Sequence, residues 1–114
     1  MEKGPSTYAE YWTSPYAEID HFDRHGELLG YDTIIEYSEG AKNLIKSSNI
    51  YLRKFKAPNG SVYIFNKKTY EFVIITKTGK IVTYYYLEGG TKAFDRLLIN
   101  ENGIEFKEWL WKIY

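Results

Sequence analysis

The chain has no cysteine among its 114 residues, and this excludes disulfide bridges, thiolate metal ligands and cysteine nucleophiles. It also has no apolar run long enough for a membrane-spanning helix. The opening residues, MEKGPS, lack the apolar segment of a secretion signal. From these absences we expect a soluble protein with no membrane association, whose fold depends on side-chain packing alone.

Three familiar catalytic signatures are absent as well. The chain contains no GxSxG element of a serine hydrolase, no GxxxxGK[ST] phosphate loop and no HExxH zinc motif. Nucleotide-dependent phosphotransfer is therefore not expected. Metal-assisted cleavage would need clustered carboxylates, whereas the acidic residues of the first half fall on both faces of the expected helices.

Aromatic residues, by contrast, are abundant: 12 Tyr, 6 Phe and 3 Trp make up 18% of the chain. Hydrophobic residues reach 44%, which is enough for a folded core and excludes a disordered chain. A length of 114 residues is that of one domain, so residues 1–114 are expected to share one aromatic-rich core. Most tyrosines are expected to span core and surface, with hydroxyl ends available to a nucleic acid or protein partner.

The formal net charge is zero, but the charges are unevenly distributed. Residues 1–50 carry four bases and nine acids, whereas residues 51–80 carry seven bases and a single acid. One interpretation is a cationic face suited to phosphates, joined to an acidic part that repels them or attracts a basic partner. The other is that exposed lysines on strands and turns provide solubility and protect sheet edges.

Helical periodicity marks much of the first half of the chain. Residues 1–13 are polar and aromatic without a period, and are interpreted as a flexible arm. Ser14-Pro15 is typical of a helix start and predicts a helix to about Leu28. Apolar residues at intervals of three and four then predict a second helix, from a cap at Asp32 to about Lys46.

After residue 49 the period changes to that of strands. Runs rich in β-formers, separated by turn residues, predict four strands at residues 50–56, 61–66, 70–76 and 81–86. The sequence therefore predicts an α+β fold in which two N-terminal helices pack on a four-stranded antiparallel β-meander. Residues 91–114 are interpreted as a helical or extended C-terminal tail: a short helix at 91–98, then a segment at 104–114 that fits a helix slightly better than a strand.

Both histidines of the chain, His21 and His25, lie four residues apart in the first predicted helix. Residues with this spacing share one helix face, and imidazole titrates near neutral pH, so the pair can supply an acid, a base or metal ligands. A zinc site would require a third protein ligand, and Phe22 and Asp23 occupy the middle positions of the motif. The pattern favours metal-free acid-base chemistry. The alternative is a pair of ordinary polar residues at the surface or core edge.

The segment HFDRHGELLGY at residues 21–31, followed by EYS at 36–38 and Ala41, resembles the opening of a group of toxin nucleases. Four later segments resemble the strands of the same group: YLRK at 51–54, VYIFN at 62–66, EFVII at 71–75 and GKIVTYY at 79–85. The group is the barnase, EndoU, colicin and RelE-like (BECR) superfamily, found in phage-borne proteins and in the C-terminal ends of contact-dependent and other polymorphic toxins. The resemblance covers about residues 18–86, and residues 91–114 match no part of it.

This resemblance implies a metal-independent toxin ribonuclease with no cofactor, acting on RNA and most often on transfer RNA. Attack of the RNA 2′-hydroxyl on the adjacent phosphate would leave a 2′,3′-cyclic phosphate, so the enzyme need only move protons and stabilise charge. We expect a monomer that acts in the cytoplasm of a target bacterium, is delivered as the end of a secreted protein, and is neutralised by a cognate immunity protein.

The resemblance also suggests which residues act. His25 is the first candidate for the general acid or base, and His21 is the second. Arg53 and Lys54 are candidates to hold the phosphate, because a guanidinium can bind two of its oxygens. The alternative for these two residues is ordinary charge at a strand edge.

Thr83 and Tyr85 alternate onto one face of the predicted sheet. They are candidates to take part in catalysis by donating hydrogen bonds to the phosphate, or to stack a base. The alternative for Thr83 is plain β-propensity. RNA is expected to lie between the first helix and the sheet.

Two other functions stay open from the sequence. One is a non-catalytic protein-binding module, such as an immunity protein or a phage accessory protein, in which the tyrosines form a recognition surface. The other is a different enzyme on the same kind of fold, such as a nucleotide-transferring or modifying toxin.

Overall fold

The structure, a computed structural model, describes residues 4–106. Its helices are the 3₁₀ turn η1 (Ala9–Tyr11), α1 (Pro15–His25), α2 (Ile34–Lys46) and α3 (Gly90–Asn100). Its strands are β1 (Leu52–Lys56), β2 (Val62–Asn66), β3 (Glu71–Ile75), β4 (Ile81–Tyr86) and β5 (Ile104–Glu105). The predicted α+β fold, with two N-terminal helices and an antiparallel meander, is confirmed.

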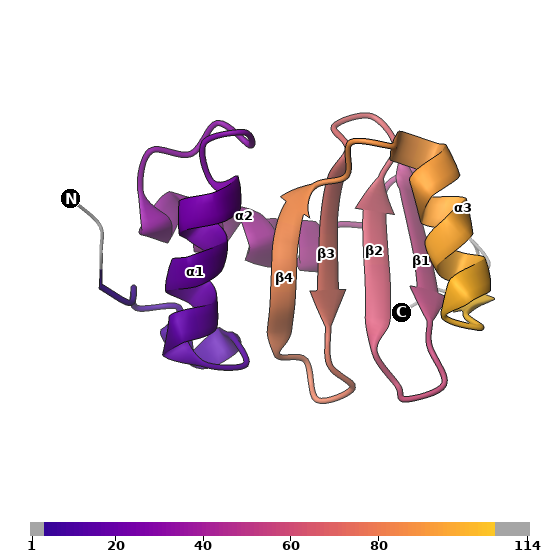
Figure 1. The fold of residues 1–114 in the computed structure, drawn as a ribbon, viewed down its shortest axis with the longest axis horizontal. Coiled ribbons are helices and arrows are strands. Elements are labelled where there is room, and N and C mark those ends of the chain that lie inside the picture. Colours follow the sequence, from indigo (N-terminus) through magenta and orange to yellow (C-terminus); the bar gives the residue numbers. More distant parts are fainter. Residues whose placement is uncertain (1–3, 107–114) are drawn as a thin grey trace.

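All five strands form one antiparallel sheet in the order β4-β3-β2-β1-β5, with helices on both faces (Figure 1). α2 packs on one face, α3 covers the other, and α1 runs beside the edge strand β4. The meander follows from short turns, of which two have glycine at positive φ: Gly60 (90°) and Gly79 (89°). The helix α1 therefore stands where β4 would otherwise expose its edge.

Alternation along the strands creates two hydrophobic cores. Ile64 faces α2 and packs with Tyr37, whereas the next residue, Phe65, faces α3 and packs with Phe94. All four of these side chains are at most 2% exposed. The sheet is thus buried on both sides, which explains why its strands read as nearly continuous apolar and aromatic runs.

The two predicted N-terminal helices form, with shifted boundaries. Ser14 accepts a hydrogen bond from the backbone N–H of Ala17 (3.0 Å), as a cap residue does. α1 ends at His25 and not near Leu28, because the chain turns so that the N–H of Tyr31 donates to the carbonyl of Gly26 (2.9 Å). The cap of α2 is Thr33, whose hydroxyl accepts from the N–H of Glu36 (3.2 Å), and not Asp32.

The flexible arm predicted for residues 1–13 is wrong for the part that the structure describes. Trp12 is 2% exposed and lies in the core against α2. The N–H of Thr13 donates to the carbonyl of Ile81 (3.0 Å), so the segment adds a short parallel bridge to β4. A single large aromatic anchors this segment, and one buried residue creates no period that the sequence could show.

The C-terminal part agrees with its prediction in one element and differs in another. The expected short helix at 91–98 is present as α3, and it supplies Phe94 to the second core. Ile104–Glu105 forms the strand β5, paired with β1, where the sequence slightly favoured a helix. Residues 107–114, for which a helix was also favoured, lie outside the described residues.

In the part of the chain that the structure describes, no helix has the length and apolar character to cross a membrane.

Candidate functional site

The two histidines meet two residues of β4. The Nδ1 atom of His21 is 3.1 Å from the hydroxyl oxygen of Thr83, and the ring centroids of His25 and Tyr85 are 5.2 Å apart. Four residues of a helix rise about 6 Å, and two residues of a strand about 6.7 Å. Because α1 and β4 run side by side in the same direction, these two spacings match and each histidine faces one strand residue (Figure 1).

Aromatic stacking holds the first imidazole from both sides. The ring centroid of His21 lies 5.9 Å from that of Trp12 and 5.6 Å from that of His25, and both pairs are stacked. Nη2 of Arg24 also lies 3.4 Å from Nδ1 of His21. A guanidinium can only donate, so a neutral His21 that accepts at Nδ1 carries its proton on Nε2.

Both imidazoles favour the neutral form. Burial lowers the pKa of His21 and of His25 below the ordinary 6.5, and the Arg24 guanidinium lowers both further. His25 also lowers the pKa of His21, whereas Asp20 acts against these effects. The pair is therefore mostly unprotonated at neutral pH and can accept a proton there.

Tyr85 completes the group as a half-buried hydroxyl donor. Its ring lies edge-on to that of Phe72, with centroids 5.2 Å apart. Burial raises the pKa of Tyr85, so the phenol keeps its proton at neutral pH. His21, His25, Thr83 and Tyr85, four of the six candidate residues, are thus brought together by the fold.

A buried carboxylate behind the histidines is a residue that the sequence reasoning missed. Glu18 is fully buried and accepts hydrogen bonds from the N–H of Ser6 (2.9 Å), the hydroxyl of Ser6 and the hydroxyl of Ser38 (2.5 Å). Ser38 in turn accepts from Nε1 of Trp12 (3.1 Å). This chain of contacts fixes the indole that stacks on His21. The available signal was that Glu18 precedes His21 by three residues, on the same helix face.

Arg53 lies apart from the histidines. Its guanidinium forms ion pairs with Asp95 of α3 (2.7 Å) and, through two nitrogens, with Glu105 of β5 (2.7 and 2.8 Å). It also lies 4.9 Å from the centroid of Phe94. These contacts join α3 and β5 to β1. Because the guanidinium already forms ion pairs with two carboxylates, the phosphate contact predicted for Arg53 is not supported.

The strand register shows how far Arg53 is from the site. Arg53 pairs with Phe65, Phe65 with Phe72, and Phe72 with Tyr85, so Arg53 and Tyr85 share a row on the same face. They are three strands apart, about 14 Å at the usual strand spacing. Phe94 of α3 packs on the row between them.

Lys54 points to the opposite face, as the alternation of β1 requires. Its ammonium lies 3.5 Å from the carbonyl oxygen of Ser47, and burial lowers its pKa. The remaining lysines of residues 51–80 do not form one cationic face either. Lys67 and Lys68 are in the turn between β2 and β3, whereas Lys77 and Lys80 flank the turn at the other end of the sheet. Among residues 4–106, the cation in contact with the histidines is Arg24, through His21.

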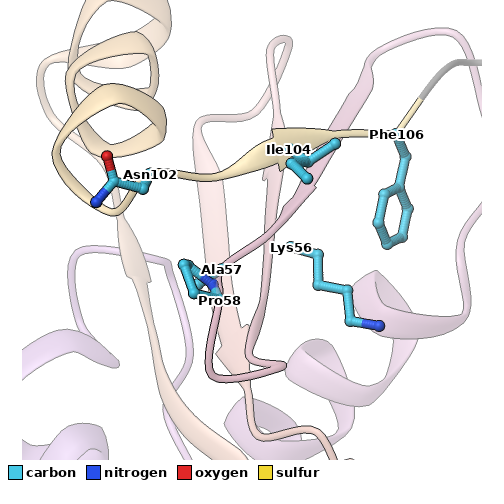
Figure 2. A pocket seen from close by; sticks show the side chains of 6 residues that line it. All are labelled: Lys56, Ala57, Pro58, Asn102, Ile104 and Phe106. Carbon is cyan, nitrogen blue, oxygen red and sulfur yellow. The ribbon is translucent and has the colours of Figure 1, made fainter.

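A pocket of about 390 Å³ lies at the other edge of the sheet, beside β1 and β5 (Figure 2). It is lined by six side chains: Lys56, Ala57, Pro58, Asn102, Ile104 and Phe106. Neither histidine is among them, so this pocket is separate from the candidate site.

Within residues 4–106 no group of three histidine, aspartate or glutamate side chains is placed to hold a metal ion.

The ion pairs of Arg53 with Asp95 and Glu105 lead to a prediction about stability. We expect Arg53→Gln to lower the free energy of unfolding by about 1–3 kcal/mol, because charge-assisted hydrogen bonds to two carboxylates are lost. The RNA cleavage that the sequence leads us to expect should stay within about twofold of the parent in the folded variant, a change too small to mark a transition-state contact. Urea unfolding and a cleavage assay measure the two effects. A large loss of cleavage with unchanged stability would restore Arg53 as a substrate ligand.

No protein-family model matches the chain, and no curated protein is significantly similar to it.

Proposed function

We propose that the protein is a metal-independent endoribonuclease of the BECR type, in which His21 and His25 move the protons. The observation that carries this proposal is the cluster at the junction of α1 and β4: two half-buried imidazoles, with ring centroids 5.6 Å apart, facing a threonine hydroxyl and a tyrosine. The resemblance of residues 18–86 to toxin nucleases supports it independently.

The chemistry suits a site of this kind. The neutral imidazole of one histidine takes the proton of the RNA 2′-hydroxyl as its oxygen attacks the adjacent phosphorus. The other histidine, in its protonated form, gives a proton to the departing 5′-oxygen, and the products are a 2′,3′-cyclic phosphate and a free 5′-hydroxyl. Protons therefore balance within the pair. After cleavage the first histidine is protonated and the second is neutral. Loss of a proton from the first to water and uptake of one by the second restore the starting state.

Arg24 takes the role that the sequence suggested for Arg53 and Lys54. Its guanidinium is next to His21, is paired with Asp20 (2.6 Å), and is about half exposed. It can bind a phosphate oxygen without a large change of the fold. The hydroxyl of Tyr85, whose ring lies against His25, is our candidate donor to the same phosphate, whereas Thr83 gives its single proton to Nδ1 of His21 and orients that imidazole.

The most direct test is to induce the protein in bacterial cells and analyse whole-cell RNA with 3′-end mapping. We expect discrete fragments, most of them from transfer RNA, that end in a 2′,3′-cyclic phosphate and accumulate as growth stops. A co-expressed immunity protein should prevent both effects. Intact RNA in cells that contain folded protein would contradict the proposal.

The pH dependence of cleavage gives a second test. A reaction that needs one neutral and one protonated histidine is fastest between their two pKa values, and both lie below 6.5. We expect a bell-shaped profile of kcat/KM with its maximum on the acid side of pH 6.5. Arg24→Gln should move both limbs to higher pH, because a positive charge that disfavours protonation is removed. A maximum above pH 7 in the parent enzyme would argue against this pair.

A non-catalytic protein-binding module is the second candidate function. The observation in its favour is that the basic residues of 51–80 are dispersed: Arg53 is held in ion pairs, Lys54 faces the opposite side of the sheet, and the other lysines are divided between its two ends. Under this alternative, expression leaves the RNA pool intact and the chain is recovered bound to a protein.

A further inference from the structure

A polar pocket, distinct from the one beside β1 and β5, lies on the other face of β4 from the histidines. It has a volume of about 290 Å³ and is lined by residues of the α1–α2 connection, of the start of β3 and of the end of β4: Leu28, Leu29, Tyr31, Thr69, Glu71 and Tyr86. Because Tyr86 and Tyr85 are neighbours in a strand, they face opposite sides of the sheet. The pocket is therefore independent of the proposed nuclease site.

Hydrogen bonds in this pocket converge on one carboxylate. Thr69 donates to Oε1 of Glu71 (2.8 Å), and the hydroxyl of Tyr84 donates to Oε2. The hydroxyl of Tyr31 is 3.2 Å from that of Tyr84. Since the single proton of Tyr84 is committed to the carboxylate, Tyr31 is the donor to Tyr84. The protons of Thr69 and Tyr84 go to Glu71 and the proton of Tyr31 goes to Tyr84, so these groups offer only acceptor positions to a ligand.

The backbone is adapted to this arrangement. A Cβ atom at position 40 would lie 2.1 Å from the hydroxyl oxygen of Tyr31, so only glycine lets that hydroxyl reach Tyr84. The chain of hydroxyls therefore depends on a close approach of Tyr31 to the α2 backbone. This contact holds one aromatic wall of the pocket in place.

The pocket is also negative. Within residues 4–106, no lysine or arginine forms an ion pair with Glu71. Burial raises the pKa of Tyr31, its hydrogen bond with Tyr84 partly offsets this, and the carboxylates of Glu71, Glu36 and Glu39 raise it further. In the neighbouring turn, the ammonium of Lys68 lies over the ring of Tyr51, 5.0 Å from its centroid.

We propose that this pocket binds a guanidinium group, as carried by arginine. Each oxygen of Glu71 accepts one hydrogen bond from the protein and keeps a free lone pair, and a planar guanidinium can donate to both oxygens at once. The tyrosine rings at positions 31 and 86 provide faces on which a delocalised cation stacks. The compact ammonium of lysine matches neither feature as well.

The test uses the whole chain and three small probes: N-acetyl-arginine amide, N-acetyl-lysine amide and the uncharged isostere N-acetyl-citrulline amide. Binding is followed by the ring NMR signals of Tyr31 and Tyr86. We expect saturable shifts with the arginine probe, and affinity at least about tenfold weaker for the other two. Free arginine and agmatine are further probes. If they bind and the blocked amide does not, the ligand is a small metabolite; if the amide binds, it is an arginine side chain of a protein.

Two variants test the assignment, with one control. Glu71→Gln should weaken binding of the arginine probe about tenfold or more. Leu28→Lys should do the same, because it places a cation at the rim of the pocket from a side chain that is 70% exposed. Glu101→Gln removes the same charge outside the pocket and should leave binding unchanged. Three outcomes would overturn the proposal. The arginine and lysine probes could bind with equal affinity, Glu101→Gln could lose as much affinity for the arginine probe as Glu71→Gln, or the arginine probe could cause no saturable shift.

Discussion

Replacement of His25 by alanine is expected to slow RNA cleavage about 100- to 10,000-fold, the usual contribution of a positioned acid or base. The imidazole lies against Tyr85, with centroids 5.2 Å apart, and is partly exposed to solvent, so its removal leaves no enclosed cavity. The far-ultraviolet circular dichroism should therefore be unchanged. Cleavage of a defined RNA, measured under single-turnover conditions, gives the loss.

The neighbouring His21 provides a comparison. His21→Ala should cause a loss of similar size, and the double variant should lose little more than either single variant, because residues that act as a unit are not additive. Glu27→Gln, an exposed change two residues from His25, is the matched control and should cleave like the parent. A folded His25→Ala protein that cleaves RNA as fast as the parent would end the nuclease proposal.

Truncation of Trp12 is expected to have the largest effect on stability. Trp12→Ala removes a side chain that is 2% exposed and packs on His21 and Tyr37, and it leaves the hydroxyl of Ser38 without its donor. Such truncations of buried aromatics cost about 3–5 kcal/mol. Urea unfolding, followed by circular dichroism, should show a midpoint shifted to lower urea.

An exposed aromatic close in sequence serves as the control for Trp12. Tyr16 is 81% exposed, and Tyr16→Ala should change the free energy of unfolding by no more than about 0.5 kcal/mol. A Trp12→Ala variant with a loss below about 1 kcal/mol would mean that residues 4–13 are as loosely attached as their sequence suggested. The stability of the parent protein should fall as the pH is lowered below 6.5, because the unfolded histidines bind protons that the folded ones resist.

Local sequence patterns were sufficient for α1, α2, α3 and the four strands of the meander, but not for η1 or β5. The capping signals at Ser14, the three-and-four spacing in α2 and the alternation of the four meander strands each depend on residues close together in the chain. Boundaries moved by one to three residues where a neighbouring residue could do the same task, as when Thr33 capped α2 in place of Asp32. Such competition between adjacent caps is decided by geometry that the sequence does not contain.

The candidate site was foreseen in part for the same reason. His21 and His25 share a helix face, and Thr83 and Tyr85 share a strand face, by local geometry alone. Their meeting required α1 to run along β4, an arrangement that the sequence analysis did not predict and that the structure shows.

What the sequence determined by itself is therefore the α+β class, the helices and the two residue pairs, because each follows from the fixed period of a helix or strand. Tertiary structure alone decided the partners of single charged and aromatic residues. Arg53 is held by carboxylates 42 and 52 positions away, and Glu18 by serines at positions 6 and 38. A lone charge carries no period, so its neighbours are set only when distant parts of the chain pack together.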